Sequence, residues 1–150
     1  MGGCRDVVER RTVALLRRPV AIARCNVRVV LALVRVRVRL WRDPKAAVRV
    51  ARGGVEREAN PGEVGQIAAA IGRWRRVIPG ATCLVQAIAT QELLVAEGHP
   101  AELFFGVTVA DDALSAHAWV ELNGAVVVGG GPNGHTVLGS VAKERATRPG

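Results

Sequence analysis

The sequence contains no tyrosine and few other aromatic residues, with 3 tryptophans and 2 phenylalanines in 150 residues. A hydrophobic core must therefore be built mainly from Val, Leu, Ile and Ala. Apolar residues make up 49% of the chain, which excludes an intrinsically disordered protein. The length is typical of one compact domain that folds without disulfide bonds or a structural metal.

Cysteines and long apolar runs are scarce as well. The three cysteines, Cys4, Cys25 and Cys83, are an odd number without paired spacing, which argues against a disulfide-linked secreted domain. The N-terminus lacks the apolar segment and cleavage site of a signal peptide. No run approaches the roughly 20 apolar residues that span a bilayer. We therefore expect a cytoplasmic protein.

Acidic residues are scarce only in the first part of the chain. Residues 1–60 carry 15 basic and 5 acidic side chains, an excess of +10, whereas residues 61–150 carry 6 and 8, an excess of −2. Such basic segments are typical of proteins that bind nucleic acid, anionic membranes or acidic partners. Because no base-stacking aromatics are interleaved with the arginines, we expect no nucleic acid but a docking surface for acidic proteins, or a weak membrane-surface contact.

Residues 1–59 are expected to form a basic helical segment. The apolar residues of Asp6–Arg18 indicate a short helix, and Pro19 is expected to end it. Val34–Arg39 alternates valine and arginine, which is typical of a strand. Over a longer window, however, the basic residues recur at intervals of 3, 4 or 7, which keeps them on one helical face. We therefore favour helix here, with a second break near residue 43.

Residues 60–142 are expected to form an α+β core, followed by a polar tail at 143–150. Thr82 suits the N-cap of a helix and Gly98 its C-terminal stop, while Asn123-Gly124 predicts a tight hairpin. Gly129–Gly134 is expected to be a loop. The expected elements are helices at Pro44–Arg52, Glu63–Val77 and Cys83–Glu97, and strands at Ala101–Val109, Ser115–Leu122 and Ala125–Val128.

Cys83 is the strongest candidate for a reacting group. It follows a Pro79-Gly80 break and opens an expected helix. At a helix N-terminus, unpaired N–H groups and the helix dipole favour the nucleophilic thiolate. The same N–H groups can stabilise an oxyanion. A buried structural cysteine, common in cores of this composition, is the alternative interpretation.

His117 is the candidate base that such a nucleophile needs. A thiol is activated by an imidazole that first accepts its proton and then delivers it to the leaving group. His117 lies in the middle of an expected strand, where a half-buried structural histidine is the alternative. A cysteine at a helix N-terminus with a histidine on a following strand is the arrangement of papain-like and transglutaminase-like enzymes.

The residues around both positions extend into longer motifs. These are Pro79-Gly80-Ala81-Thr82-Cys83-Leu84, Gln86-Ala87, Leu93-Leu94, Gly98-His99-Pro100-Ala101, Gly106-Val107, and Ala116-His117-Ala118-Trp119-Val120-Glu121 followed by Asn123-Gly124. The motifs resemble those of the lasso peptide biosynthesis B2 proteins, which are transglutaminase-like leader peptidases. The resemblance spans about Asn60–Leu138. It implies a papain/transglutaminase-like core, with Cys83 as nucleophile and His117 as general base and acid.

The resemblance also implies partners. Members of that family cleave the leader from a precursor peptide that a separate recognition protein holds, and an ATP-using cyclase then closes the macrolactam. We therefore expect the precursor peptide, the leader-recognition protein and the cyclase as partners. The cysteines and histidines lack the spacing of a zinc site, and no Walker loop or dinucleotide fingerprint is present. We expect neither a metal nor a cofactor.

The chain departs from the resembled pattern at Gly129, where the family usually has an aspartate twelve residues after the histidine. The two-residue turn between the last two expected strands would place His117 opposite Gly130. We expect either the main-chain carbonyl of Gly129 or Gly130, or the side chain of Asn133, to accept the imidazole N–H. Glu121 is a poor substitute because it lies about 13 Å along the strand from His117.

Two other functions remain open from the residues alone. Cys83 and His117 would equally support transglutaminase-like acyl transfer to an amine. A non-enzymatic module that binds nucleic acid or a membrane through the arginine-rich segment is the other alternative. Of the remaining candidates, His135 is expected to be a solvated loop residue and His99 to favour a helix C-terminus. Trp119 is expected to pack in the core.

Overall fold

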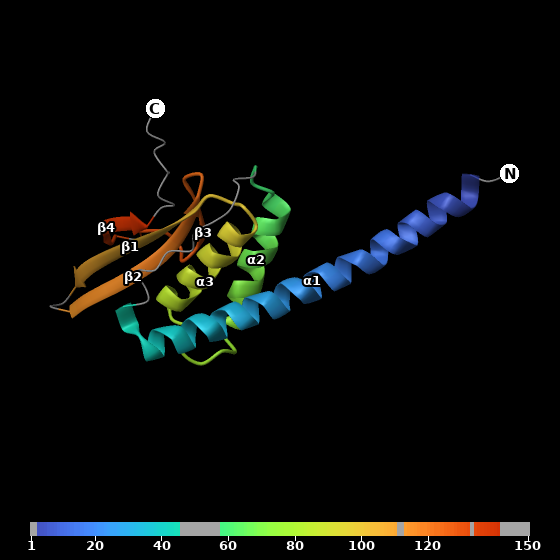
Figure 1. Cartoon of the computed structure of the whole chain (residues 1–150). Coiled ribbons are helices and arrows are strands. Elements are labelled where there is room, and N and C mark those ends of the chain that lie inside the picture. Colours follow the sequence, from blue (N-terminus) through green and yellow to red (C-terminus); the bar gives the residue numbers. More distant parts are fainter. Residues whose placement is uncertain (1–2, 46–57, 111–112, 133, 142–150) are drawn as a thin grey trace, which may run out of the picture.

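Three helices and a four-stranded antiparallel sheet make up the computed structural model, which describes residues 3–45, 58–110, 113–132 and 134–141 (Figure 1). The helices are α1 (Gly3–Arg42), α2 (Pro61–Trp74) and α3 (Cys83–Ala96), and the strands are β1 (Ala101–Ala110), β2 (Ala113–Leu122), β3 (Ala125–Val128) and β4 (Thr136–Val141). The strand order is β3-β2-β1-β4. The predicted α+β class is confirmed.

The N-terminal segment is one helix, α1, and the predicted break at Pro19 is wrong. A proline inside a helix removes one hydrogen bond and favours a kink. The chain from Cys4 to Cys25 contains no glycine or asparagine that could form a turn. The break near residue 43 is present, because the Asp43 carboxylate accepts a hydrogen bond from the Lys45 N–H at 3.0 Å. Most of the helix expected at Pro44–Arg52 lies outside the described residues.

Local capping explains where α2 and α3 begin. Asn60 caps α2, its Oδ1 accepting the Gly62 N–H at 3.0 Å. Thr82 caps α3 as predicted, its Oγ1 accepting the Val85 N–H at 3.4 Å. After α3, Gly98 takes the left-handed conformation that closes many helices, with φ of +86°. Cys83 is therefore the first residue of α3.

The sheet contains the three predicted strands and one more. β1 and β2 pair from Ala101↔Leu122 to Ala110↔Ala113, and β3 returns after the turn at Asn123-Gly124. β4 is not predicted from the sequence, because its residues end in Leu-Gly-Ser-Val without clear alternation. It pairs with β1 and gives the sheet its fourth strand.

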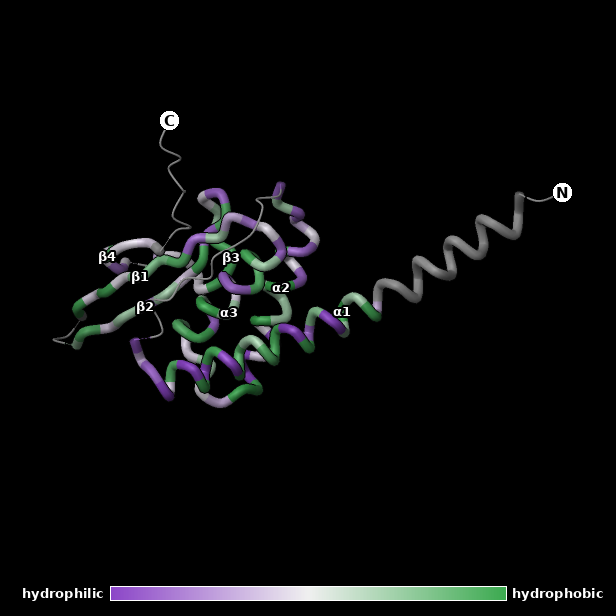
Figure 2. Tube along the Cα trace, viewed as in Figure 1, coloured by the Kyte–Doolittle hydropathy of each residue, from purple (hydrophilic) through white to green (hydrophobic). Residues whose placement is uncertain are grey.

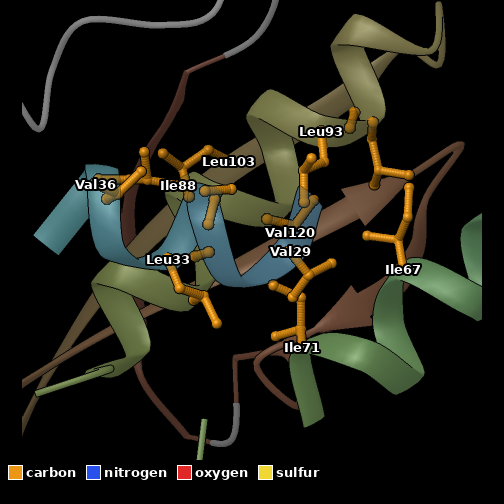
Figure 3. Packing of buried hydrophobic residues seen from close by; sticks show 14 of the residues in the cluster. Val29, Leu33, Val36, Ile67, Ile71, Ile88, Leu93, Leu103 and Val120 are labelled. Atoms are coloured by element: carbon orange, nitrogen blue, oxygen red, sulfur yellow. The ribbon is translucent and has the colours of Figure 1, made fainter. Parts of the chain in front are cut away.

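The core lies between the sheet and the helices, and it is almost entirely aliphatic. α3 lies against β1 and β2, α2 lies beside β3, and the second half of α1 packs against α2 and α3 (Figure 1). Figure 3 shows the central contacts, made by Val29, Leu33, Val36, Ile67, Ile71, Ile88, Leu93, Leu103 and Val120. The second half of α1 therefore shares one core with the rest of the chain, and the boundary at residue 59 stays a prediction.

None of the helices in the described part of the chain combines the length and the apolarity needed to cross a bilayer.

Candidate active site

Cys83 lies at the N-terminus of α3, after a turn that three side-chain hydrogen bonds stabilise. Its side chain is half-buried. The preceding turn is fixed by Arg37 of α1, whose Nε donates to the Pro79 carbonyl at 3.2 Å. Gln86, one helical turn into α3, donates its Nε2 back to the Ala81 carbonyl at 2.6 Å. These contacts and the Thr82 cap hold the turn that carries the cysteine.

The first turn of α3 keeps two N–H groups free. The Val85 N–H is capped by the Thr82 side chain, and the Gln86 N–H donates to the Thr82 carbonyl at 3.0 Å. Within the described residues, the N–H groups of Cys83 and Leu84 donate no hydrogen bond. The first N–H groups of a helix have no intrahelical acceptor. They are therefore available to a negatively charged oxygen beside the thiol.

His117 on β2 is held by a main-chain group. Its Nε2 lies 2.6 Å from the carbonyl oxygen of Gly129. Because a carbonyl only accepts hydrogen bonds, Nε2 carries the hydrogen of this pair. In the neutral ring Nδ1 then keeps its lone pair, so Nδ1 is the atom that can take a proton.

Gly129 cannot carry a side chain in this backbone. Its φ is +102°, and a Cβ would lie 2.6 Å from the Trp119 Cβ and 2.7 Å from the Trp119 Cα. The aspartate of the resembled pattern would therefore collide with β2. The structure offers the carbonyl of the same residue to the imidazole instead.

The β2–β3 register differs from that of an unbroken hairpin. Leu122 pairs with Ala125 and Glu121 with Val126, as a two-residue turn requires. A bulge then shifts the register by one residue, so that Val120 pairs with Val128, where β3 ends. The unbroken register that would place His117 opposite Gly130 is therefore absent, and the Gly129 carbonyl reaches the ring from the segment that follows β3, where Gly129 packs against Trp119. Asn133, the other candidate acceptor, lies outside the described residues.

Two other rings pack against His117. The Trp119 ring is stacked at a centroid distance of 5.9 Å, and the His135 ring is tilted at 5.1 Å. The strand neighbour of His117 on β1 is Gly106, where a Cβ would lie 2.9 Å from the His135 Cβ and 3.1 Å from the Trp119 ring. His135 lies in the loop before β4, as predicted, but it is half-buried against the His117 ring and not solvated. The glycine in the middle of β1 is the sequence signal for this packing.

Cys83 and His117 line the same cleft, which has a volume of about 430 Å³. One wall comes from α2, and the other comes from β3 and the glycines after it. Polar and apolar groups contribute about equally to the surface of the cleft, and Arg75 places one cation at its wall. The remaining lining residues are Ala68, Ile71, Gly72, Gln86, Val127, Val128, Gly129 and Gly130. Such a cleft offers both apolar contacts and hydrogen-bonding groups to a chain segment laid across the thiol.

The other polar candidates do not line the cleft. Glu121 accepts a hydrogen bond from the Trp119 Nε1 at 2.8 Å. Trp119 itself is buried, as predicted. His99 is fully buried, and its Nε2 lies 3.4 Å from the Glu63 carboxylate. Among the described residues, no group of three or more His, Cys, Asp or Glu could hold a metal ion.

Cys25 on α1 contrasts with Cys83. It is half-buried beside the core and does not line the cleft. Burial raises the pKa of the Cys25 thiol above its ordinary value, while Arg28 lowers it and Glu97 raises it by less. The thiol of Cys25 is thereby kept in its unreactive form.

A family model described as the transglutaminase-like superfamily matches residues 30–141. The matched region includes the second half of α1, all of α2 and α3, and the sheet. It therefore contains Cys83, His117 and every residue that lines the cleft. Comparisons with curated proteins and with solved structures give no match.

Proposed function

The chain belongs to the transglutaminase-like superfamily, and from this premise we propose that it is a cysteine peptidase that removes the leader from a ribosomally made lasso precursor peptide. The superfamily typically contains cysteine peptidases and acyltransferases. The observation that carries the proposal is the shared cleft of Cys83 and His117. The motifs around these two residues, which resemble the lasso leader peptidases, support the choice of substrate.

In the proposed first step, the Cys83 thiol transfers its proton to Nδ1 of His117, and the sulfur attacks the carbonyl carbon of the scissile peptide bond. Nδ1 is free for this step because the Gly129 carbonyl occupies Nε2–H. The charge that develops on the carbonyl oxygen is stabilised by the unpaired N–H groups of Cys83 and Leu84. The helix dipole of α3 favours both the thiolate and this oxyanion.

In the second step, the carbon–nitrogen bond breaks and His117 delivers its proton to the departing amine. A thioester then links the acyl part of the peptide to Cys83. His117 next takes a proton from water, whose oxygen attacks the thioester carbon, and the proton finally returns to the sulfur. The two products are a free carboxylic acid and a free amine.

The third member of the triad is a main-chain carbonyl in this proposal. A carbonyl oxygen orients the imidazole and selects its tautomer as a carboxylate would. It carries no negative charge, however, so it stabilises the imidazolium less. Its position is fixed by the backbone, and it cannot rotate away from the ring.

Variants of the two reacting side chains test the proposal. The assay mixes the full chain with a lasso precursor peptide and its leader-recognition protein, and mass spectrometry follows the products. We expect Cys83→Ala and His117→Ala each to lower the cleavage rate by about 10³-fold or more. Cys25→Ala is the matched control, because it removes the other half-buried thiol and should leave the rate unchanged. Full activity in either site variant would exclude the mechanism.

Acyl transfer is the alternative outcome of the same assay. The thioester on Cys83 would then react with an amine in place of water. Hydrolysis adds the mass of water to the cleaved peptide, whereas transfer leaves an amide link between two molecules. We also propose that the recognition protein is required and that the cyclase acts on the released peptide. Cleavage of the precursor at an undiminished rate without the recognition protein would contradict that requirement.

A further inference from the structure

The helix α1 carries two apolar faces, of which its own domain buries only one. The inner face is buried in the core through Val29, Ala32, Leu33 and Val36. A second set of large apolar side chains is 41% to 76% exposed, and we name it the outer stripe. It consists of Val20, Val27, Leu31, Val34, Val38 and Trp41.

The outer stripe lies directly opposite the buried face. At 3.6 residues per turn, the residues of the stripe cluster on one side of the helix axis and Val29, Leu33 and Val36 cluster on the other. The stripe is about 30 Å long, at 1.5 Å of rise per residue. Figure 2 shows apolar and polar residues alternating along the second half of α1.

The spacing within the outer stripe is that of a coiled-coil seam. Its residues are separated by 7, 4, 3, 4 and 3 positions, which matches the a and d positions of a heptad. Arg24 occupies the one seam position that is not apolar. A surface that recurs at this spacing is suited to pack side by side with a second helix.

The charges beside the stripe are all of one sign. No acidic residue occurs between Glu9 and Asp43. On the side that faces α3, Arg28 pairs with Glu97, and Arg35 and Arg39 pair with Glu92 at 2.7 Å and 2.6 Å. Arg24 and Arg42 form no ion pair with any described residue. Arg24 lies within the seam and Arg42 lies beside it at helical spacing.

Three kinds of occupant could cover the outer stripe: a second copy of the chain, a membrane surface, or a helix of a partner protein. The charges beside the stripe decide between them. A second copy of the chain would bring arginine against arginine along the seam, which is unfavourable. A membrane surface is less suited, because Arg28, Arg35 and Arg39 are neutralised within the chain and four of the six stripe residues are valines that form a narrow band. An amphipathic helix with acidic flanks complements both the apolar seam and the unpaired arginines.

We propose that the outer stripe of α1 is the docking surface for an acidic amphipathic helix of a partner protein. The partner helix presents apolar residues at heptad spacing and Asp or Glu beside them. Its apolar residues cover the stripe, and its carboxylates meet Arg24 and Arg42. This proposal is independent of the chemistry at Cys83.

A designed peptide tests the chemistry of this surface. The probe is a helical peptide of about three heptads with Leu at a and d and Glu at e and g, and the control peptide has Lys in place of Glu. Titration of the full chain, followed by fluorescence anisotropy of the labelled peptide, measures the affinity. We expect the acidic peptide to bind, the basic peptide not to bind, and the affinity to fall as salt is added.

A matched pair of variants locates the surface. Leu31→Asp places a charge in the outer stripe, and Leu138→Asp places the same charge on β4, where the leucine is equally exposed, at 67% against 63%. We expect Leu31→Asp to weaken the binding of the acidic peptide by about tenfold or more and Leu138→Asp to leave it unchanged. Circular dichroism checks that both variants are folded.

Three results would overturn the proposal. The first is equal affinity for the acidic and basic peptides, or no binding of either. The second is a concentration-dependent dimer in size-exclusion chromatography that Leu31→Asp abolishes, which would assign the stripe to a second copy of the chain. The third is binding to phosphatidylglycerol vesicles while the acidic peptide does not bind, which would assign it to a membrane surface.

Discussion

The contact between α1 and α3 and the cleft around Cys83 are held together by different kinds of group. Charged side chains connect the two helices, since Glu92 accepts a hydrogen bond from Arg35 and forms an ion pair with Arg39, and Glu97 accepts from Arg28. At the cleft the acceptors are main-chain carbonyls. Gly129 accepts from His117, Ala81 from Gln86, and Pro79 from Arg37.

This difference indicates the structural role of the basic excess in residues 1–60. The arginines of α1 attach that helix to the domain and flank its outer face, and none of the ion pairs between described residues includes His117. A carbonyl can orient a ring only if the backbone brings it close, which explains the cluster of residues with positive φ at Gly129, Gly130 and Gly131. The basic residues therefore stabilise the packing of α1 on the domain, whereas the orientation of His117 depends on a main-chain carbonyl.

Gly129→Ala is expected to have the largest effect on this comparison, because it attacks the backbone acceptor. The added Cβ would lie within 2.8 Å of the Trp119 Cβ and Cα and of the Ala118 carbonyl, so the chain after β3 must move away from β2. We expect cleavage activity to fall by about 100-fold, as when an orienting group of a triad is lost. Steady-state kinetics and thermal unfolding measure the change.

Gly124→Ala separates the clash from the backbone strain. Gly124 also has a positive φ, of +79°, but a Cβ there meets no atom within 4 Å. Gly124→Ala should cost about 1 kcal/mol of stability and leave the activity intact.

Nitrogen NMR of His117 adds a second readout for Gly129→Ala. The tautomer that carries the hydrogen on Nε2 should dominate only while the Gly129 carbonyl is in place. Full activity and an unchanged tautomer in Gly129→Ala would show that the main-chain acceptor is not needed.

The reactivity of the two described thiols gives a smaller contrast. In a Cys4→Ser background, we expect iodoacetamide to modify Cys83 about ten times faster than Cys25 at neutral pH. Cys83 lines the cleft at a helix N-terminus, whereas burial raises the pKa of the Cys25 thiol. A raised pKa lowers the fraction of thiolate at any given pH. The labelling of Cys25 should therefore accelerate only at a more alkaline pH than that of an ordinary thiol.

Mass spectrometry of the labelled peptides follows both sites in one sample. In the urea-unfolded chain the burial of Cys25 disappears, and the two thiols should then react at similar rates. If Cys25 reacts as fast as Cys83 in the folded chain, the contrast between a structural and a reactive cysteine is wrong.

Local patterns in the sequence predicted most of the elements around the cleft. Thr82, Gly98 and Asn123-Gly124 act within a few residues of themselves, and the helix and the hairpin that they delimit are present. The choice of helix over strand for residues 20–42 is also confirmed, because the periodicity of a long window outweighs a short alternation.

The errors arise where distant parts of the chain meet. Pairing with β1 makes Thr136–Val141 a strand, and its own residues do not reveal that partner. The bulge opposite Val120 changes the register that the turn alone predicts, and the Gly129 carbonyl meets the imidazole from the segment that follows β3. His135 packs on His117 because Gly106 leaves room for it. Each of these depends on a contact between separate strands that no single segment specifies.

The smallest effect is expected from the ion pairs between α1 and α3, and it is expected on stability alone. Glu92→Gln removes the carboxylate that pairs with Arg35 and Arg39, at a side chain that is only 10% exposed. We expect the free energy of unfolding to fall by about 1–2 kcal/mol, since a charge-assisted hydrogen bond from Arg35 and a partly buried ion pair with Arg39 are weakened. Glu97→Gln, at a side chain that is 28% exposed, should cost only about 0.5 kcal/mol. Urea unfolding measures both values.

Both variants should retain full cleavage activity, because neither carboxylate lines the cleft. Added salt should reduce the cost of Glu97→Gln more than that of Glu92→Gln, since screening acts most strongly on exposed pairs. A loss of activity in Glu92→Gln without loss of fold would show that the attachment of α1 reaches the reacting residues. The route would then be Arg37, which lies between Arg35 and Arg39 on α1 and holds the Pro79 carbonyl of the turn before Cys83. Unchanged activity would show that the ion pairs stabilise the contact between α1 and α3 without affecting the reacting residues, whose orientation depends on main-chain groups.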